Sequence, residues 1–192
     1  MKISLIVTDA SPLITLAIAE SLDTLLMLDV RVIIPDMVNF EVTKHIDKPG
    51  SKELLNWIKL HQFNEVFIGS TEVFSEYIML QKIDPLVKSR NRGEQAAAEI
   101  LKSEIDNKTE AAILLFEDSD IKKANFLVRL PSNVLIMSTS TFLEGLQQRK
   151  LIVSADKVLQ RAVKIRGEGI LKRIKIPMED VEDISDSWPS NF

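Results

Sequence analysis

The sequence predicts a three-layer α/β/α fold built on a central, mostly parallel sheet. Short apolar runs alternate along the chain with longer segments in which apolar residues recur at helical spacing. This alternation is typical of a parallel sheet with helices on both faces. The chain has 192 residues, of which 45% are hydrophobic. That is enough for one sizeable core in an ordinary globular domain.

The expected strands are short and rich in β-branched or aliphatic residues. They cover residues 3–7, 30–34, 64–68, 111–116 and 134–137. After the first strand we expect a helix with Ser11 as N-cap and Pro12 at its first position. Asp36 is expected to cap the helix after Pro35, and Gly93 opens an alanine-rich helix.

The predicted organisation is a main domain over residues 1–153 and a C-terminal helical appendage with an acidic tail over residues 154–192. Extra helices are expected between residues 43 and 92, where the turn Pro49-Gly50 and the break Asp84-Pro85 separate helical patterns. Trp57 and Phe63 in this segment are expected to be core residues, because large apolar side chains are usually buried.

Composition excludes several classes of protein. There is no cysteine, and there are only two histidines, so a disulfide framework and a Cys- or His-built metal cluster are excluded. The net charge of −4 argues against bulk electrostatic coating of nucleic acid, although local RNA binding remains compatible. No apolar run suits a membrane helix and no signal peptide is evident, so we expect a cytoplasmic protein without a membrane partner.

Four carboxylates are expected at one edge of the sheet. Asp9 and Asp118 each follow a predicted strand, and Glu41 and Glu94 lie in helices that begin near the same edge. Ligands of open parallel sheets bind outside the carboxyl ends of the strands. Each acid taken alone is explained as a helix cap or a solvated side chain. Together they would repel one another, and hard cations such as Mg²⁺ or Mn²⁺ would relieve that repulsion.

These segments resemble the PIN-domain family. The stretch VTDASPLITLAIAESLDTLL followed by VIIPDMVNFEV is similar to the opening of bacterial and archaeal PIN domains. NRGEQAAAEI resembles the family's third acidic segment and LLFEDSDIKKA its fourth, and MSTST supplies the hydroxyl residue after the next strand. The resemblance runs from about residue 3 to residue 152. It implies a PIN-like α/β/α fold and a metal-dependent endoribonuclease.

The resemblance also implies a role for each residue. Asp9 and Asp118 would bind the metal, Glu94 would bind it or orient a water, and Glu41 would complete the shell. Many relatives are toxins of toxin–antitoxin pairs (the VapC type), which implies an RNA substrate, an antitoxin protein partner and a homodimer. The residues expected to position RNA phosphates are Ser11, Thr139, Lys122 and Lys123.

Three alternatives stay open at this point. Asp120 or Glu117 could serve as the fourth acidic ligand in place of Asp118. The chain could also be a catalytically silent PIN-like module that binds RNA or protein. A phosphatase that uses Asp118 and Asp120 is a weaker reading, because that chemistry normally follows the first strand.

Overall fold

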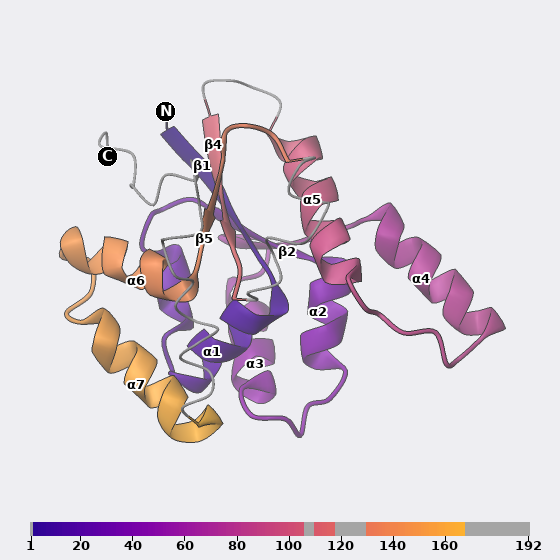
Figure 1. The fold of residues 1–192 in the computed structure, drawn as a ribbon, viewed down its shortest axis with the longest axis horizontal. Coiled ribbons are helices and arrows are strands. Elements are labelled where there is room, and N and C mark those ends of the chain that lie inside the picture. Colours follow the sequence, from indigo (N-terminus) through magenta and orange to yellow (C-terminus); the bar gives the residue numbers. More distant parts are fainter. Residues whose placement is uncertain (1, 106–109, 118–129, 168–192) are drawn as a thin grey trace.

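A computed structural model describes residues 2–105, 110–117 and 130–167 (Figure 1). The elements, in chain order, are β1 (Lys2–Thr8), α1 (Ala10–Ile18), the 3₁₀ helix η1 (Leu22–Leu26), β2 (Arg31–Pro35), α2 (Asp36–Thr43), α3 (Ser51–His61), β3 (Val66–Gly69), α4 (Glu72–Ile83), α5 (Arg92–Glu104), β4 (Glu110–Leu115), β5 (Val134–Met137), α6 (Thr139–Gln148) and α7 (Ala155–Arg166).

The five strands form one sheet in the order β3-β2-β1-β4-β5, and every neighbouring pair is parallel. The carboxyl ends of β1, β2 and β4 therefore lie at the same edge. The sheet is buried because alternate residues face two separate apolar layers. Ile34 and Leu115 face the layer formed with α1, α3, α6 and α7, whereas Ile33 and Leu114 face α5. The predicted three-layer α/β/α fold on a central parallel sheet is confirmed.

The helix after β1 starts earlier than the sequence predicts. Asp9 occupies the N-cap position with an extended backbone, and α1 begins at Ala10. The predicted Ser11 cap is therefore wrong, and Pro12 stands at the third helical residue, where the first turn still tolerates it. The reason is tertiary: the Asp9 amide donates to the Leu115 carbonyl at 3.1 Å, so sheet pairing holds the chain up to Asp9.

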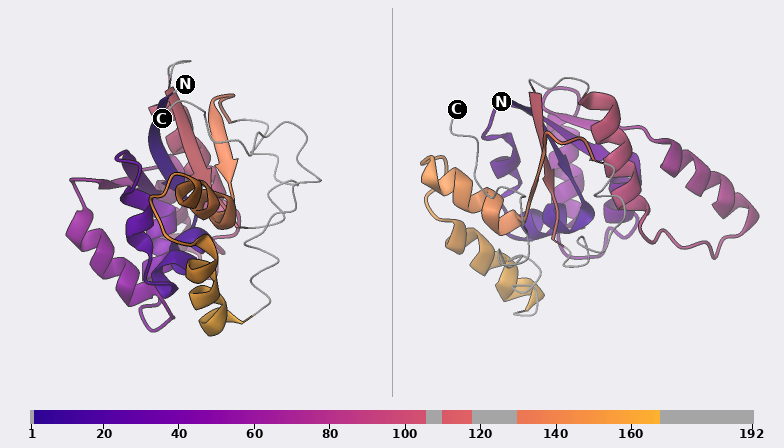
Figure 2. Two further views of the ribbon diagram at one scale, coloured as in Figure 1. Left: turned by 90° about the vertical axis from the view of Figure 1, so that its left-hand side faces the viewer. Right: turned by 45° about the horizontal axis from the view of Figure 1, so that its top comes forward.

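Residues 43–92 contribute a strand as well as helices. β3 pairs with β2 as an edge strand of the central sheet, between α3 and α4. Asp36 fastens the start of α2 to the start of α4: its carboxylate accepts hydrogen bonds from the Met37 amide (2.8 Å), the Thr71 amide (2.9 Å) and the Thr71 hydroxyl (2.7 Å). Beyond this junction α4 projects away from the sheet in both figures (Figures 1 and 2).

The helix at the start of the predicted appendage packs into the main core. Ala155, Val158, Leu159 and Ala162 of α7 are buried in the same apolar cluster as α1 and α6. Across the described ranges, no helix is both long and apolar enough to span a membrane.

Candidate functional site

Three segments distant in the sequence meet at the carboxyl edge of the sheet. Asp9 follows β1 directly, and the β1–β4 register pairs Thr8 with Leu115, so the ends of these two strands are adjacent. Glu41 lies on the second turn of α2, which begins where β2 ends. Glu94 lies in the first turn of α5. In the described part of the chain, α5 contacts both α2 and β1, which brings its N-terminal turn to this edge.

Gly93 is the residue on which the convergence depends. A Cβ atom built on Gly93 would lie 3.3 Å from Oδ1 of Asp9, 3.5 Å from Oε2 of Glu41 and 3.5 Å from a methyl group of Val38. Gly93 is buried, so the α5 backbone passes directly beside two carboxylates from other elements. Glycine favours this close backbone approach because a side chain would press on the carboxylate of Asp9; its φ is not positive, so no unusual backbone conformation is involved.

Keeping the carboxylates at this edge ionised costs free energy. The pKa of Asp9 is raised to about 7: burial is the largest cause and the negative charges of Glu94 and Glu41 add to it, while hydrogen bonds from the Ala10 and Ser11 amides oppose the rise. Burial also raises the pKa of Glu41; a hydrogen bond with Ser89 lowers it and the charge of Glu94 raises it. The cluster therefore holds negative charge that a nearby positive group would stabilise.

The donor type is suited to a hard divalent cation, because all three side chains offer carboxylate oxygens. Within the described ranges, however, no three acidic or histidine side chains are arranged to hold a metal ion. Asp9, Glu41 and Glu94 thus form part of an acidic site. Asp118 and Asp120, which the sequence adds to it, lie outside the described residues.

Comparison with known proteins points to one family. Residues 5–85 match a family model described as a PIN domain. This segment of the chain is therefore similar to PIN domains. The matched segment contains Asp9 and Glu41, while Glu94 and all later residues lie beyond it. No curated protein and no solved structure matches the chain. PIN domains are generally nucleases and typically use divalent metals.

Beside this acidic site, a fourth carboxylate is buried at the end of β4. Glu117 is 1% exposed. One of its oxygens accepts a hydrogen bond from the Thr139 hydroxyl of α6 at 2.5 Å, and the other accepts one from the Thr15 hydroxyl of α1 at 2.9 Å. Arg166 of α7 donates to the Thr15 hydroxyl at 2.8 Å and lies 3.9 Å from Glu117. This network joins four elements next to the expected fourth acid.

Burial raises the pKa of Glu117, and the Thr139 and Thr15 hydrogen bonds and the charge of Arg166 lower it. Both hydroxyls and Arg166 therefore stabilise the ionised carboxylate. Thr139, which the sequence assigns to RNA positioning, has its hydroxyl engaged by Glu117. No local pattern indicates that Thr15 contacts Glu117, since the two residues are 102 positions apart.

The remaining positions assigned from sequence divide into two groups. Ser11 is partly buried in the first turn of α1, where its amide faces Asp9. Lys122 and Lys123 lie outside the described residues, as do Asp118 and Asp120.

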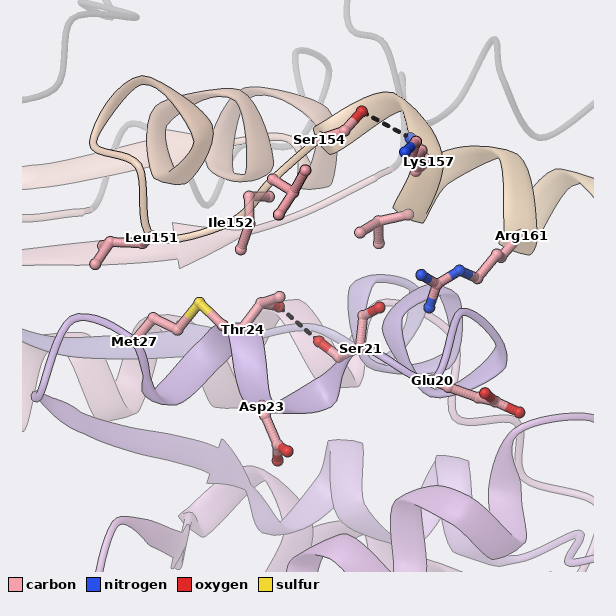
Figure 3. Close-up of a pocket in the computed structure, with 12 residues that line it drawn as sticks. Glu20, Ser21, Asp23, Thr24, Met27, Leu151, Ile152, Ser154, Lys157 and Arg161 are labelled. Carbon is pink, nitrogen blue, oxygen red and sulfur yellow. Dashed lines mark hydrogen bonds between the residues drawn. The ribbon is translucent and has the colours of Figure 1, made fainter.

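A surface cavity of about 370 Å³ lies between η1 and the connection from α6 to α7 (Figure 3). Its lining combines apolar side chains such as Met27 and Leu151 with charged ones such as Glu20 and Lys157. Arg161 reaches across to the Ala19 carbonyl at 3.2 Å, so part of its polar lining is already engaged. None of the carboxylates described above lines this cavity.

Proposed function

We propose that the chain is a divalent-metal-dependent endoribonuclease that hydrolyses RNA phosphodiester bonds. The observation that carries the proposal is the approach of Asp9, Glu41 and the start of α5 around Gly93, at the edge of a parallel sheet where ligands bind. The match to a PIN domain over residues 5–85 supports the same reaction class.

In this proposal Asp9 and Asp118 would hold Mg²⁺ or Mn²⁺, with Asp120 as the alternative fourth acid. Glu117, the other alternative in the sequence, does not fit this role because it is 1% exposed and both of its oxygens accept hydrogen bonds inside the protein. When bound, such a cation acidifies a water molecule and offsets charge on the phosphate oxygens. Glu94 binds the cation or orients the water, and Glu41 completes the acidic shell. The water attacks phosphorus in line, the P–O bond to the leaving oxygen breaks, and a carboxylate of this cluster takes the proton of the water.

The proposed partners follow from this chemistry. RNA is the substrate, and its phosphates would be positioned by Ser11, Lys122 and Lys123, while buried Thr139 would act indirectly by holding Glu117. We further propose that the chain is the toxin of a cytoplasmic toxin–antitoxin pair, with a small antitoxin protein that covers the acidic site, and that it forms a homodimer.

The test is cleavage of single-stranded RNA with and without Mg²⁺ or Mn²⁺. We expect the parent protein to cleave only when the metal is present and the Asp9→Asn variant not to cleave. Asp47→Asn is the matched control, because it makes the same chemical change at an exposed turn. Mn²⁺ should also raise the melting temperature of the parent and of the control, but not that of Asp9→Asn, because a ligand that binds only the folded state stabilises it.

A catalytically silent RNA- or protein-binding module is the second candidate. The observation in its favour is that the described residues contain no complete set of three metal-holding side chains. This candidate predicts RNA binding without cleavage and no effect of Mn²⁺ on melting. Either cleavage that Asp9→Asn abolishes or a metal-dependent rise in melting temperature would count against it.

A further inference from the structure

Four cations lie beside the acidic site, on α2 and on the connection from α4 to α5. Lys44 follows α2 directly, three residues beyond Glu41. Lys88, Arg90 and Arg92 occupy every second position of the connection, and residues 85–93 contain no acid. Figure 1 shows this connection returning from the far end of α4 to the start of α5, which contacts α2. We call these four residues the cationic rim.

The connection is held against the site by side chains that alternate with the cations. Val87 packs against the apolar cluster formed by α2, α4 and α5. The side chain of Ser89 forms a hydrogen bond with Glu41. Lys88 and Arg90, the two neighbours of Ser89, are exposed. The same segment therefore contacts the acidic site and presents positive charge to solvent beside it.

The other two cations of the rim are held by aromatic rings. The guanidinium carbon of Arg92 lies 5.4 Å from the centre of the Tyr77 ring, and the ammonium nitrogen of Lys44 lies 5.3 Å from that of Phe40. The two rings contact each other edge to face, with their centres 5.8 Å apart. A cation over an aromatic face is attracted to it, and its N–H groups can still donate to an anion. Because Tyr77 is buried, it restricts where Arg92 can lie.

The rim does not neutralise the acids beside it. Among residues 2–105, 110–117 and 130–167, the ion pairs involve Arg31, His61 and Arg166, and none joins a cation of the rim to a carboxylate. Arg92 is only two residues from Glu94, yet it lies over Tyr77. The positive charge of the rim therefore stays available to an anion that binds next to the acidic site.

We propose that the cationic rim binds backbone phosphates of the RNA strand next to the phosphate that reaches the acidic site, with Arg90 and Arg92 as the principal contacts. The inference rests on the proposed function, because it takes RNA as the ligand, and it adds the side from which the strand is held. The planar fork of arginine matches phosphate oxygens with two hydrogen bonds. Phosphate contacts position a strand without reading its sequence, so the rim should hold RNA of any sequence.

The proposal also assigns a purpose to α4. This helix supplies Tyr77, over which Arg92 lies, and the chain that leaves its far end supplies Lys88 and Arg90. The helix would thus serve RNA binding through the residues that it places beside the acidic site.

RNA binding in EDTA tests the rim separately from cleavage. Fluorescence anisotropy of two labelled single-stranded RNAs of different sequence, over a series of salt concentrations, measures the dissociation constant and its salt dependence. We expect Arg90→Gln/Arg92→Gln to raise the dissociation constant of both RNAs roughly 10-fold or more at low salt. The slope of log K against log salt should fall by about 1.4, since each phosphate contact of a single strand contributes about 0.7. Arg90→Gln alone, at an exposed position, should lower the slope by about 0.7 and leave the melting temperature unchanged.

Two further variants separate local contacts from charge and geometry. Arg31→Gln is the matched control, because it makes the same chemical change at the start of β2, at the opposite edge of the sheet. It should leave both the dissociation constant and the slope close to those of the parent. Arg92→Lys keeps the charge, so the slope should stay the same, but binding should weaken because an ammonium group lacks the planar fork.

Unchanged affinity in Arg90→Gln/Arg92→Gln, or an equal loss in Arg31→Gln, would overturn the proposal. An acidic protein would then be the better candidate ligand for these cations. A parent protein that does not bind single-stranded RNA in EDTA at low salt would overturn it as well. Binding through the rim without cleavage in Mg²⁺ or Mn²⁺ would support the rim and refute only the proposed nuclease activity, so the two proposals can fail separately.

Discussion

Replacing Asp9 by asparagine removes a charge from the site while keeping nearly the same side-chain shape. The pKa of Asp9 rises from 3.8 to about 7 in the folded protein. At about 1.4 kcal/mol per pKa unit, this shift makes the ionised carboxylate cost at most about 4 kcal/mol of stability. The asparagine amide cannot keep every hydrogen bond that the carboxylate accepts from Ala10 and Ser11. We therefore expect Asp9→Asn to stabilise the fold by about 1–3 kcal/mol at pH 8, a trade of activity for stability.

The stabilisation by Asp9→Asn relative to the parent should increase as the pH rises. Below pH 3.8 the carboxyl is protonated in both the folded and the unfolded chain, so it costs nothing. Between pH 3.8 and about 7 the folded state holds the proton that the unfolded state releases, so the stability of the parent falls relative to the variant as pH rises. Above about pH 7 the difference between the two proteins should be constant.

Urea unfolding of the parent and of Asp9→Asn between pH 4.5 and 8, with EDTA to remove divalent ions, measures this difference. Asp47→Asn should show no such trend, because Asp47 is exposed. An advantage for Asp9→Asn that is absent at pH 8, or one that is equal at pH 4.5 and pH 8, would refute the burial and repulsion argument.

Three further substitutions test the surroundings of the site. Gly93→Ala places a methyl group 3.3 Å from a carboxylate oxygen, so RNA cleavage should fall at least 10-fold; the thermal midpoint should stay within a few degrees, because alanine favours the helix by up to about 1 kcal/mol. Thr139→Val removes a donor from buried Glu117 and should cost about 1–3 kcal/mol in urea unfolding. The loss of stability caused by Thr139→Val should be smaller in a Glu117→Gln background than in the parent. An equal loss in both backgrounds would contradict this. Thr71→Val breaks the hydroxyl bond to Asp36 and should cost about 1–2 kcal/mol, whereas Thr71→Ser should be close to the parent in the same measurement.

Local patterns in the sequence were sufficient to predict the strands of the sheet. The runs 3–7, 111–116 and 134–137 coincide closely with β1, β4 and β5, because buried parallel strands need continuous aliphatic residues. The N-terminus of α1 was misplaced since Asp9 is held by a hydrogen bond to Leu115, more than a hundred residues away. Phe63, expected in the core, is 78% exposed at a positive φ of 74°, whereas Trp57 is buried as predicted.

The acids of the site were predictable where they lie at the end of a strand or near the start of a helix with a clear sequence pattern. Asp9 and Glu41 are fixed by the ends of β1 and β2, which the sequence defines well. The role of Gly93 as a spacer was missed, because it depends on how α5 crosses α2, and helix-to-helix approach leaves no local pattern. The hydroxyl partners of Glu117 were missed for the same reason: Thr15 and Thr139 come from different helices.

The acidic site and the projecting helix are connected through one short segment. The chain leaves α4 at Ile83 and returns to α5 at Arg92, and on the way Ser89 forms the hydrogen bond that lowers the pKa of Glu41. The charge state of Glu41 therefore depends on a residue of the connection between α4 and α5 as well as on the edge of the sheet itself.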